Sequence, residues 1–214
     1  MPLFKSLSSN NKSPQEFKIA VWRISEEEQE LKENLELSST SHKRLTQIKS
    51  EAQRSAFLAV RKLIKVLGYS DQQLSYNQNG KPYLEGVGSV SISHTAQYAA
   101  VAVGYNCQMG VDIERHREQI ERIAPKFCGP GAVRELKDRA ERIEKLTAIW
   151  GAKEAVYKIL DRPGLSFRQD IHIDDFVMLS KHSSAWTDTE RFHFSFDSFD
   201  HHTLVYAYMA KSLS

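Results

Sequence analysis

Two carboxylates lie one residue apart in the segment MGVDIER, residues 109–115. They are Asp112 and Glu114, and Val111 and Ile113 alternate with them, which predicts a half-buried strand. Side chains at positions i and i+2 of a strand emerge on one face, roughly 7 Å apart. Two like charges on one face are unfavourable unless a cation lies between them or one acid takes up a proton. The pair fits a Mg²⁺ site and solvated acids on an edge strand equally well.

A second group of polar residues lies in EKLTAIWGAKEAVYKIL, residues 144–160, which has helical apolar spacing. Glu154 and Lys158 lie one turn apart on the flank of the apolar stripe, and Lys153 lies in its middle. In one interpretation the Lys153 stem packs while its ammonium group reaches solvent, and the Glu154–Lys158 pair is an ordinary surface pair. In the other, both lysines and Glu154 face a cleft that binds anionic groups. The helix alone leaves both interpretations open.

The composition limits the class of protein. The chain has 214 residues, of which 41% are hydrophobic and 26% charged, as in soluble globular proteins. Its longest apolar stretches are shorter than the roughly 20 residues of a membrane-spanning helix, and its first residues lack the apolar region of a secretory signal. Two cysteines are too few for a disulfide framework, so we expect a cytoplasmic protein. The net charge of +2 argues against general nucleic-acid binding.

Periodicity predicts an α+β protein of two similar halves, residues 1–106 and 107–214, each with an antiparallel sheet packed on a long helix. Residues 1–16 are expected to form a loose arm. Helices are predicted over residues 25–37, 43–67, 117–127, 133–144 and 144–160. Strands are predicted over residues 17–24, 89–93, 98–104, 109–114, 170–179, 191–197 and 204–210. Asn79-Gly80 predicts a tight turn before Lys81 and Pro82.

Four segments in order, NGKPYL (79–84), SISHT (91–95), GVDIE (110–114) and WGAKEAVYKIL (150–160), carry a family resemblance. The chain resembles the 4′-phosphopantetheinyl transferase superfamily over about residues 40–165. It is most similar to the monomeric, surfactin-synthetase-activating type, because the trimeric holo-acyl-carrier-protein synthase type is about half as long. The resemblance implies a pseudo-dimer with its active site between the two halves.

The resemblance also implies an activity. Such enzymes transfer the 4′-phosphopantetheine arm of coenzyme A to a serine of an apo acyl or peptidyl carrier protein and release adenosine 3′,5′-bisphosphate. The reaction depends on Mg²⁺, coenzyme A is a substrate, and the carrier is acidic. For this chain it implies a monomeric cytoplasmic transferase, with fatty-acid biosynthesis among the pathways such enzymes serve.

In the half after residue 107, the resemblance assigns the metal and the catalytic groups. Asp112 and Glu114 would hold Mg²⁺ on the pyrophosphate. Glu154 would complete the metal site, act as general base on the carrier serine, or do both. Lys158 would stabilise the pyrophosphate as its bond breaks, and Trp150 would anchor the helix. A serine hydroxyl is a weak nucleophile, so a positioned carboxylate base suits this chemistry.

In the first half, the resemblance assigns coenzyme A binding. Ser93 and His94 would contact the phosphates, and Lys81 with Pro82 would line the adenine and 3′-phosphate side. A basic residue of the first long helix would grip the 3′-phosphate. Arg54 and Arg44 are the candidates, and Lys43 and Arg61 remain open.

Two other functions remain open. One is a non-catalytic module that keeps the fold and binds coenzyme A or a carrier protein. The other is a Mg²⁺-dependent nucleotide hydrolase that would need Lys81, His94 and Lys158 as its phosphate cradle, because the sequence contains no P-loop.

Overall fold

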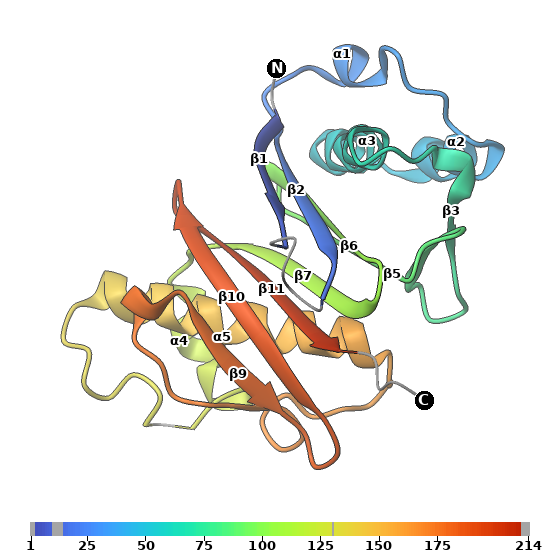
Figure 1. The fold of residues 1–214 in the computed structure, drawn as a ribbon. Helices are drawn as coiled ribbons and strands as arrows, with labels where there is room; N and C mark the ends of the chain where they lie inside the picture. Colours follow the sequence, from blue (N-terminus) through green and yellow to red (C-terminus); the bar gives the residue numbers. More distant parts are fainter. Residues whose placement is uncertain (1–2, 10–14, 130, 211–214) are drawn as a thin grey trace. The chain divides into compact units, whose positions relative to one another are not determined.

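The computed structural model describes residues 3–9, 15–129 and 131–210. Contacts divide these residues into two compact units: unit 1 comprises the described residues up to Gln108 together with Ala210, and unit 2 comprises Met109–Met209. Each unit contains an antiparallel sheet and helices (Figure 1), so the predicted α+β class is confirmed. The boundaries of the predicted halves, their similarity and the place of the active site stay predictions.

The sheet of unit 1 has the strand order β1-β2-β6-β5, and all its pairings are antiparallel. The strands are β1 (Leu3–Ser8), β2 (Phe17–Arg23), β5 (Ser89–His94) and β6 (Tyr98–Gly104). Every residue of the central strand β6 is buried. The expected loose arm is wrong for residues 3–8, because their backbone pairs with β2. Residues 1–2 and 10–14 of that expected arm lie outside the described residues.

The helices of unit 1 are shorter than their apolar patterns predict. They are α1 (Glu28–Lys32), α2 (Ser39–Gln47) and α3 (Glu51–Val66), followed by the 3-10 turn η1 (Asp71–Gln73). The predicted helix over 43–67 is wrong as a single element, because Ile48 and Ser50 have extended backbones and divide it into α2 and α3. The buried face of α3 packs on β2, β5 and β6 and forms the core of unit 1.

A two-stranded hairpin, β3 (Leu74–Tyr76) with β4 (Pro82–Leu84), completes unit 1. The predicted tight turn is confirmed: Gly80 has φ +83° and its N–H donates to the carbonyl of Asn77. This turn sets the register that pairs Tyr76 with Pro82.

The sheet of unit 2 has the strand order β7-β11-β10-β9-β8. The strands are β7 (Cys107–Arg115), whose first two residues belong to unit 1, β8 (His172–Ile173), β9 (His182–Trp186), β10 (Arg191–Phe199) and β11 (His202–Ala210). The predicted strand over 170–179 is wrong beyond β8. Phe176 turns into the core, whereas Val177 and Leu179 are 69% and 90% exposed around the 3-10 turn η3 (Met178–Ser180).

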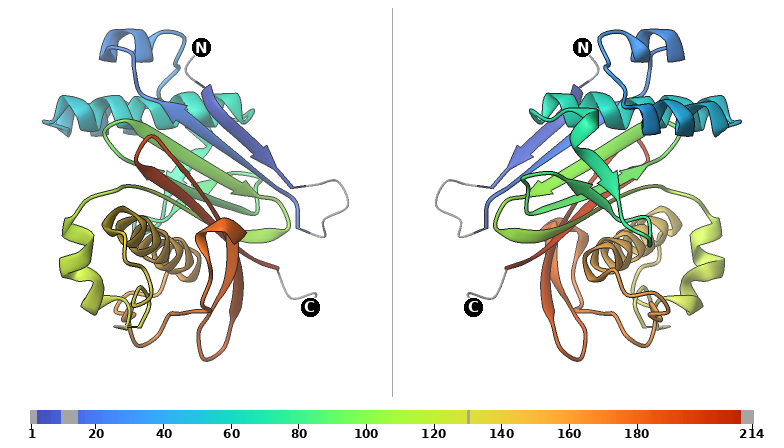
Figure 2. Two further views of the ribbon diagram at one scale, coloured as in Figure 1. Left: turned by 90° about the vertical axis from the view of Figure 1, so that its left-hand side faces the viewer. Right: turned by 90° about the vertical axis from the view of Figure 1, so that its right-hand side faces the viewer.

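The long helix of unit 2 is α5 (Arg139–Leu160), preceded by the short α4 (Gln119–Ile123) and the 3-10 turn η2 (Ala124–Lys126). The two predicted helices over 133–144 and 144–160 are instead one, which begins after Asp138. The Asp138 carboxylate caps this helix by accepting a hydrogen bond from the Glu141 N–H. Figure 2 shows α5 lying along one face of the unit 2 sheet, where it contacts β8, β9 and β10.

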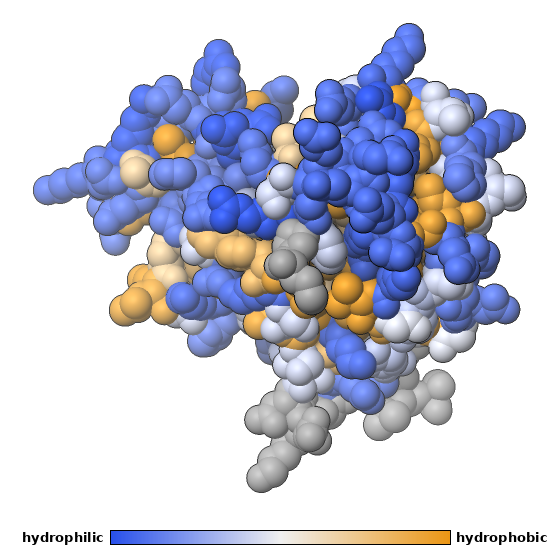
Figure 3. All heavy atoms as spheres, turned by 90° about the horizontal axis from the view of Figure 1, so that it is seen from above, coloured by the Kyte–Doolittle hydropathy of each residue, from blue (hydrophilic) through white to orange (hydrophobic). Residues whose placement is uncertain are grey.

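No helix among the described residues is long and apolar enough to cross a membrane. On the face displayed in Figure 3, hydrophilic residues predominate and hydrophobic residues form smaller patches among them.

Candidate active site

The acids of β7 differ in their exposure. Asp112 is only 4% exposed and Glu114 is half-buried. The prediction of a half-buried strand is therefore wrong at Asp112, which is buried together with Val111 and Ile113. Burying a carboxylate is costly unless it is paired, so its surroundings decide what the site can do.

Two glycines allow α5 to approach the strand that carries these acids. A Cβ atom on Gly110 of β7 would lie 1.9 Å from the carbonyl oxygen of Ala155. A Cβ atom on Gly151 would lie 2.7 Å from Cγ2 of Val205 and 3.6 Å from Oδ2 of Asp112. The missing side chains let the helix backbone rest directly on the sheet, beside Asp112.

Lys158 of α5 is the cation that pairs with Asp112. Its Nζ lies 2.8 Å from Oδ1 of Asp112 and donates a second hydrogen bond, of 2.9 Å, to the carbonyl of Val111. Both contacts hold the last turns of α5 to β7. The sequence-predicted catalytic residues Asp112 and Lys158 are thus brought together.

Glu114 and Glu154 lie in the electrostatic field of the same pair. The Trp150 indole N–H donates to Oε1 of Glu114 at 3.2 Å. Burial, followed by the negative charge of Asp112, raises the pKa of Glu114 to about 7 despite this hydrogen bond. Burial and Asp112 also raise the pKa of Glu154, against the lowering effect of Lys158. Three carboxylates and one lysine leave the site short of positive charge.

Lys153 fits neither interpretation offered for it. It is 4% exposed, and its Nζ donates to the backbone carbonyls of Phe167 and Ile171. Burial lowers its pKa to about 8. The ammonium group therefore fastens the segment after α5 to the helix. Lys153 also lines a pocket of about 550 Å³ in unit 2, but neither Glu154 nor Lys158 lines that pocket.

Within the described residues, no group of three or more His, Cys, Asp and Glu side chains is arranged to hold a metal ion. Asp112, Glu114 and Glu154 nevertheless supply carboxylate oxygens, the donors that Mg²⁺ prefers. The raised pKa values of Glu114 and Glu154 indicate that a further positive charge would stabilise the ionised cluster. The donor set therefore suits Mg²⁺ in chemistry and charge.

Unit 1 contains a separate pocket of about 370 Å³, which includes part of the predicted coenzyme A site. Of the predicted residues, Arg44, Pro82 and His94 line it, while Lys81 and Ser93 adjoin two of them in the chain. The rest of the lining is mixed apolar and polar, and comprises Ile48, Gln53, Phe57, Val60, Arg61, Tyr76, Gly80 and Ile92. The pocket lies entirely within unit 1.

Two of the basic residues considered for the 3′-phosphate are engaged elsewhere. Arg54 donates to Glu28 at 2.6 Å and to the carbonyls of Ile48 and Lys49. Arg61 lines the pocket but is buried, with its Nε 3.1 Å from Oδ1 of Asp71. Arg44 and Lys43 are exposed on α2, and of these two Arg44 lines the pocket.

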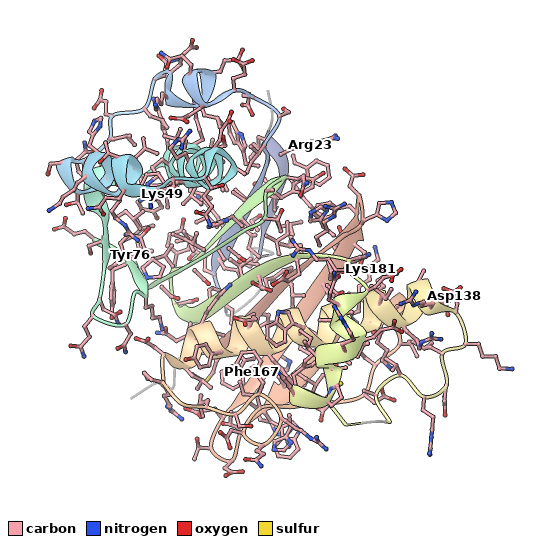
Figure 4. The ribbon with its side chains drawn as sticks, turned by 180° about the vertical axis from the view of Figure 1, so that it is seen from behind. Arg23, Lys49, Tyr76, Asp138, Phe167 and Lys181 are labelled. Carbon is pink, nitrogen blue, oxygen red and sulfur yellow. The ribbon has the colours of Figure 1, made fainter. Side chains whose placement is uncertain are left out.

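Sequence reasoning missed Tyr76 and Gly110. Tyr76 lies on β3; Figure 4 labels both Tyr76 and Lys49, which lies in the turn between α2 and α3. The centroid of the Tyr76 ring lies 4.2 Å from the guanidinium carbon of Arg44. Gly110 could have been found within the GVDIE segment, because a glycine inside a strand commonly marks the close approach of another backbone.

Comparison with known proteins bears on the second half of the chain. None of the curated proteins compared with the chain matches it. Residues 108–208 contain most of β7, all of α5 and the site built by Asp112, Glu114, Glu154 and Lys158. These residues match the family model of the 4′-phosphopantetheinyl transferase superfamily.

Proposed function

We propose that the protein transfers the 4′-phosphopantetheine arm of coenzyme A to a serine of an apo carrier protein, acting as a holo-[acyl-carrier-protein] synthase. The observation that carries the proposal is the junction of β7 and α5. There Lys158 pairs with Asp112, and Glu114 and Glu154 lie in the field of the same carboxylate. This junction falls within the residues that match the superfamily model.

In this proposal Asp112, Glu114 and Glu154 hold Mg²⁺. When bound, Mg²⁺ would neutralise the charge of the coenzyme A pyrophosphate. Lys158 adds a positive charge for the leaving adenosine 3′,5′-bisphosphate, whose negative charge grows as the phosphoanhydride bond breaks. The Nζ–Val111 hydrogen bond fixes the position of this charge.

Glu154 is the proposed general base for the carrier serine. Without a metal ion, burial and Asp112 raise the pKa of Glu154, whereas bound Mg²⁺ and Lys158 would keep its carboxylate ionised, as a base must be. The bond that forms joins the serine oxygen to the phosphorus of the phosphopantetheine arm. The proton of the serine hydroxyl passes to the Glu154 carboxylate.

The unit 1 pocket is the proposed binding site for the nucleotide part of coenzyme A. Arg44 and His94 would contact phosphate, and Pro82 would line the adenine side, with Lys81 and Ser93 next to them in the chain. The net charge of +2 is compatible with an acidic carrier as the second substrate. We propose a monomer of the surfactin-synthetase-activating type, active in the cytoplasm.

Intact-mass spectrometry tests the proposal. Purified protein, coenzyme A, Mg²⁺ and an apo carrier are expected to yield a carrier heavier by one phosphopantetheine. Glu154→Gln should lose at least about a hundredfold in rate while still binding coenzyme A. Glu141→Gln, at an exposed position on the same helix, is the matched control and should retain wild-type rates.

Two results would count against this function. Binding of coenzyme A without mass gain on acyl and peptidyl carriers would indicate a non-catalytic binding module. Full activity of Glu154→Gln would remove Glu154 from the role of base.

A further inference from the structure

The guanidinium group of Arg44 is supported by an aromatic ring. Arg44 is exposed on α2, and its Cζ lies 4.2 Å from the ring centroid of the half-buried Tyr76. A long arginine side chain that is exposed on a helix otherwise samples many rotamers. Stacking on Tyr76 restricts it to the wall of the unit 1 pocket, which both residues line.

Tyr76 is itself held by a buried ion pair. The Nη2 of Arg61 lies 3.5 Å from the Tyr76 hydroxyl, and the Nε of Arg61 donates to Asp71. Register in the β3–β4 hairpin places Tyr76 opposite Pro82, another residue of the pocket wall. The ring therefore has little freedom to leave Arg44.

The same ion pair holds the start of the helix that carries Arg44. Asp71 accepts hydrogen bonds from the backbone N–H of Ser38 at 2.8 Å and from the hydroxyl of Ser41 at 3.0 Å. Ser38 is the N-cap of α2, and the Nη2 of Arg61 also donates to the Ser41 hydroxyl. Asp71 thus fixes the start of α2, the helix that carries Arg44, while Tyr76 fixes the side chain of Arg44.

Arg61 is well placed to support this arrangement and poorly placed to bind a ligand. Its guanidinium lies 3.4 Å from the centroid of the Phe57 ring and donates to Asp71, to Ser41 and to the carbonyl of Phe57. Most of its hydrogen-bonding capacity is thus used within the protein.

We propose that Tyr76 is a positioning residue for phosphate recognition: it holds the Arg44 guanidinium at the pocket wall, and the Arg61–Asp71 pair holds both Tyr76 and α2. This inference rests on the proposed function in one respect, that the phosphate bound at Arg44 is the 3′-phosphate of coenzyme A. Arg44 would contact the phosphate, whereas Tyr76 would act through Arg44.

Binding of coenzyme A and of 3′-dephospho-coenzyme A, measured by calorimetry without carrier protein, tests the inference. The two ligands differ by the one phosphate in question. Arg44→Ala should weaken coenzyme A binding by about tenfold and change 3′-dephospho-coenzyme A binding less than about twofold. Tyr76→Leu should show the same selectivity, with a loss of about three- to tenfold for coenzyme A alone.

Three further variants separate positioning from a structural role. Tyr76→Phe keeps the ring that stacks on Arg44 but loses the hydroxyl contact with Arg61, so it should weaken coenzyme A binding less than Tyr76→Leu does. Tyr83→Leu, a change of the 49% exposed tyrosine on β4, is the matched control and should alter neither affinity. The double variant Arg44→Ala/Tyr76→Leu should bind no more weakly than Arg44→Ala, because both changes remove one shared contact.

Equal losses for the two ligands in Tyr76→Leu, or additive losses in the double variant, would overturn the inference. Failure of the wild-type protein to bind either ligand would overturn the inference together with the proposed nucleotide site. Selective binding without transfer to any carrier would sink the proposed activity and leave the positioning role standing.

Discussion

Replacement of Gly110 by alanine tests how closely α5 must lie on β7. The added Cβ would lie 1.9 Å from the Ala155 carbonyl oxygen and 2.7 Å from its carbonyl carbon. Non-bonded contact needs roughly 3.5 Å, so the helix backbone must retreat by about 1.5 Å. Helix backbone yields less readily than the end of a side chain, because its hydrogen bonds fix its position.

We expect Gly110→Ala to lower the free energy of unfolding by about 2–3 kcal/mol, at the upper end of ordinary overpacking costs. The melting temperature should fall by roughly 5–10 °C for a chain of this size. Retreat of α5 would also lengthen the 2.8 Å contact of Lys158 with Asp112, so transfer to a carrier should fall more than stability alone explains.

Urea unfolding followed by circular dichroism provides the assay, with the transfer rate measured well below the unfolding midpoint. Gly129→Ala is the matched control, since a Cβ there meets no atom within 4 Å. The packing argument fails if Gly110→Ala unfolds within about 0.5 kcal/mol of Gly129→Ala. It also fails if the transfer rate is unaltered.

Two further changes concern buried ionisable groups. Lys153→Met keeps the stem of the side chain but leaves the carbonyls of Phe167 and Ile171 without the ammonium donor. It should lower the free energy of unfolding, measured in urea, by about 2 kcal/mol. An unchanged midpoint of urea unfolding would contradict the role of Lys153 in fastening this segment. Because the pKa of Glu114 rises from 4.5 to about 7 on folding, the folded chain binds its proton more tightly. Without divalent ions, the free energy of unfolding should therefore decrease as the pH rises from 4.5 to 7, by at most about 3 kcal/mol. Glu114→Gln should flatten this pH dependence, and a wild-type slope in that variant would refute the assignment.

Local patterns predicted the β7 strand well because Val111 and Ile113 must be buried whichever partner the acids take. The same patterns could not show that Asp112 is buried too. Its burial depends on α5 approaching at Gly110, a contact between residues 45 apart in the chain (110 and 155). Short-range periodicity contains no information about such a partner.

The break between α2 and α3 shows a second limit. Apolar positions continue at helical spacing through Leu45 and Ile48, so the pattern predicts one helix. The extended backbone at Ile48 and Ser50 interrupts it, and Arg54 then donates to the carbonyls of Ile48 and Lys49 at the break. Its place on the helix makes Arg54 a candidate for binding the 3′-phosphate. In the structure, its N–H groups instead stabilise the junction between α2 and α3.

The resemblance located the candidate residues of the site better than it described their contacts. It identified Asp112 and Lys158 separately, and the structure shows them as an ion pair. The resemblance assigned no role to Lys153. The carbonyls that accept its hydrogen bonds are 14 and 18 residues further along the chain. Acceptors of this kind are formed by backbone, so no residue type in the sequence marks them.

The burial of Lys153 also makes its amine a kinetic reporter. The side chain is 4% exposed, and its Nζ donates to the carbonyls of Phe167 and Ile171. We expect reagents such as acid anhydrides to acylate it when the segment that holds these two carbonyls detaches from α5. Its acylation rate should then become independent of reagent concentration at high reagent. That limiting rate would measure how often this segment opens in the native protein.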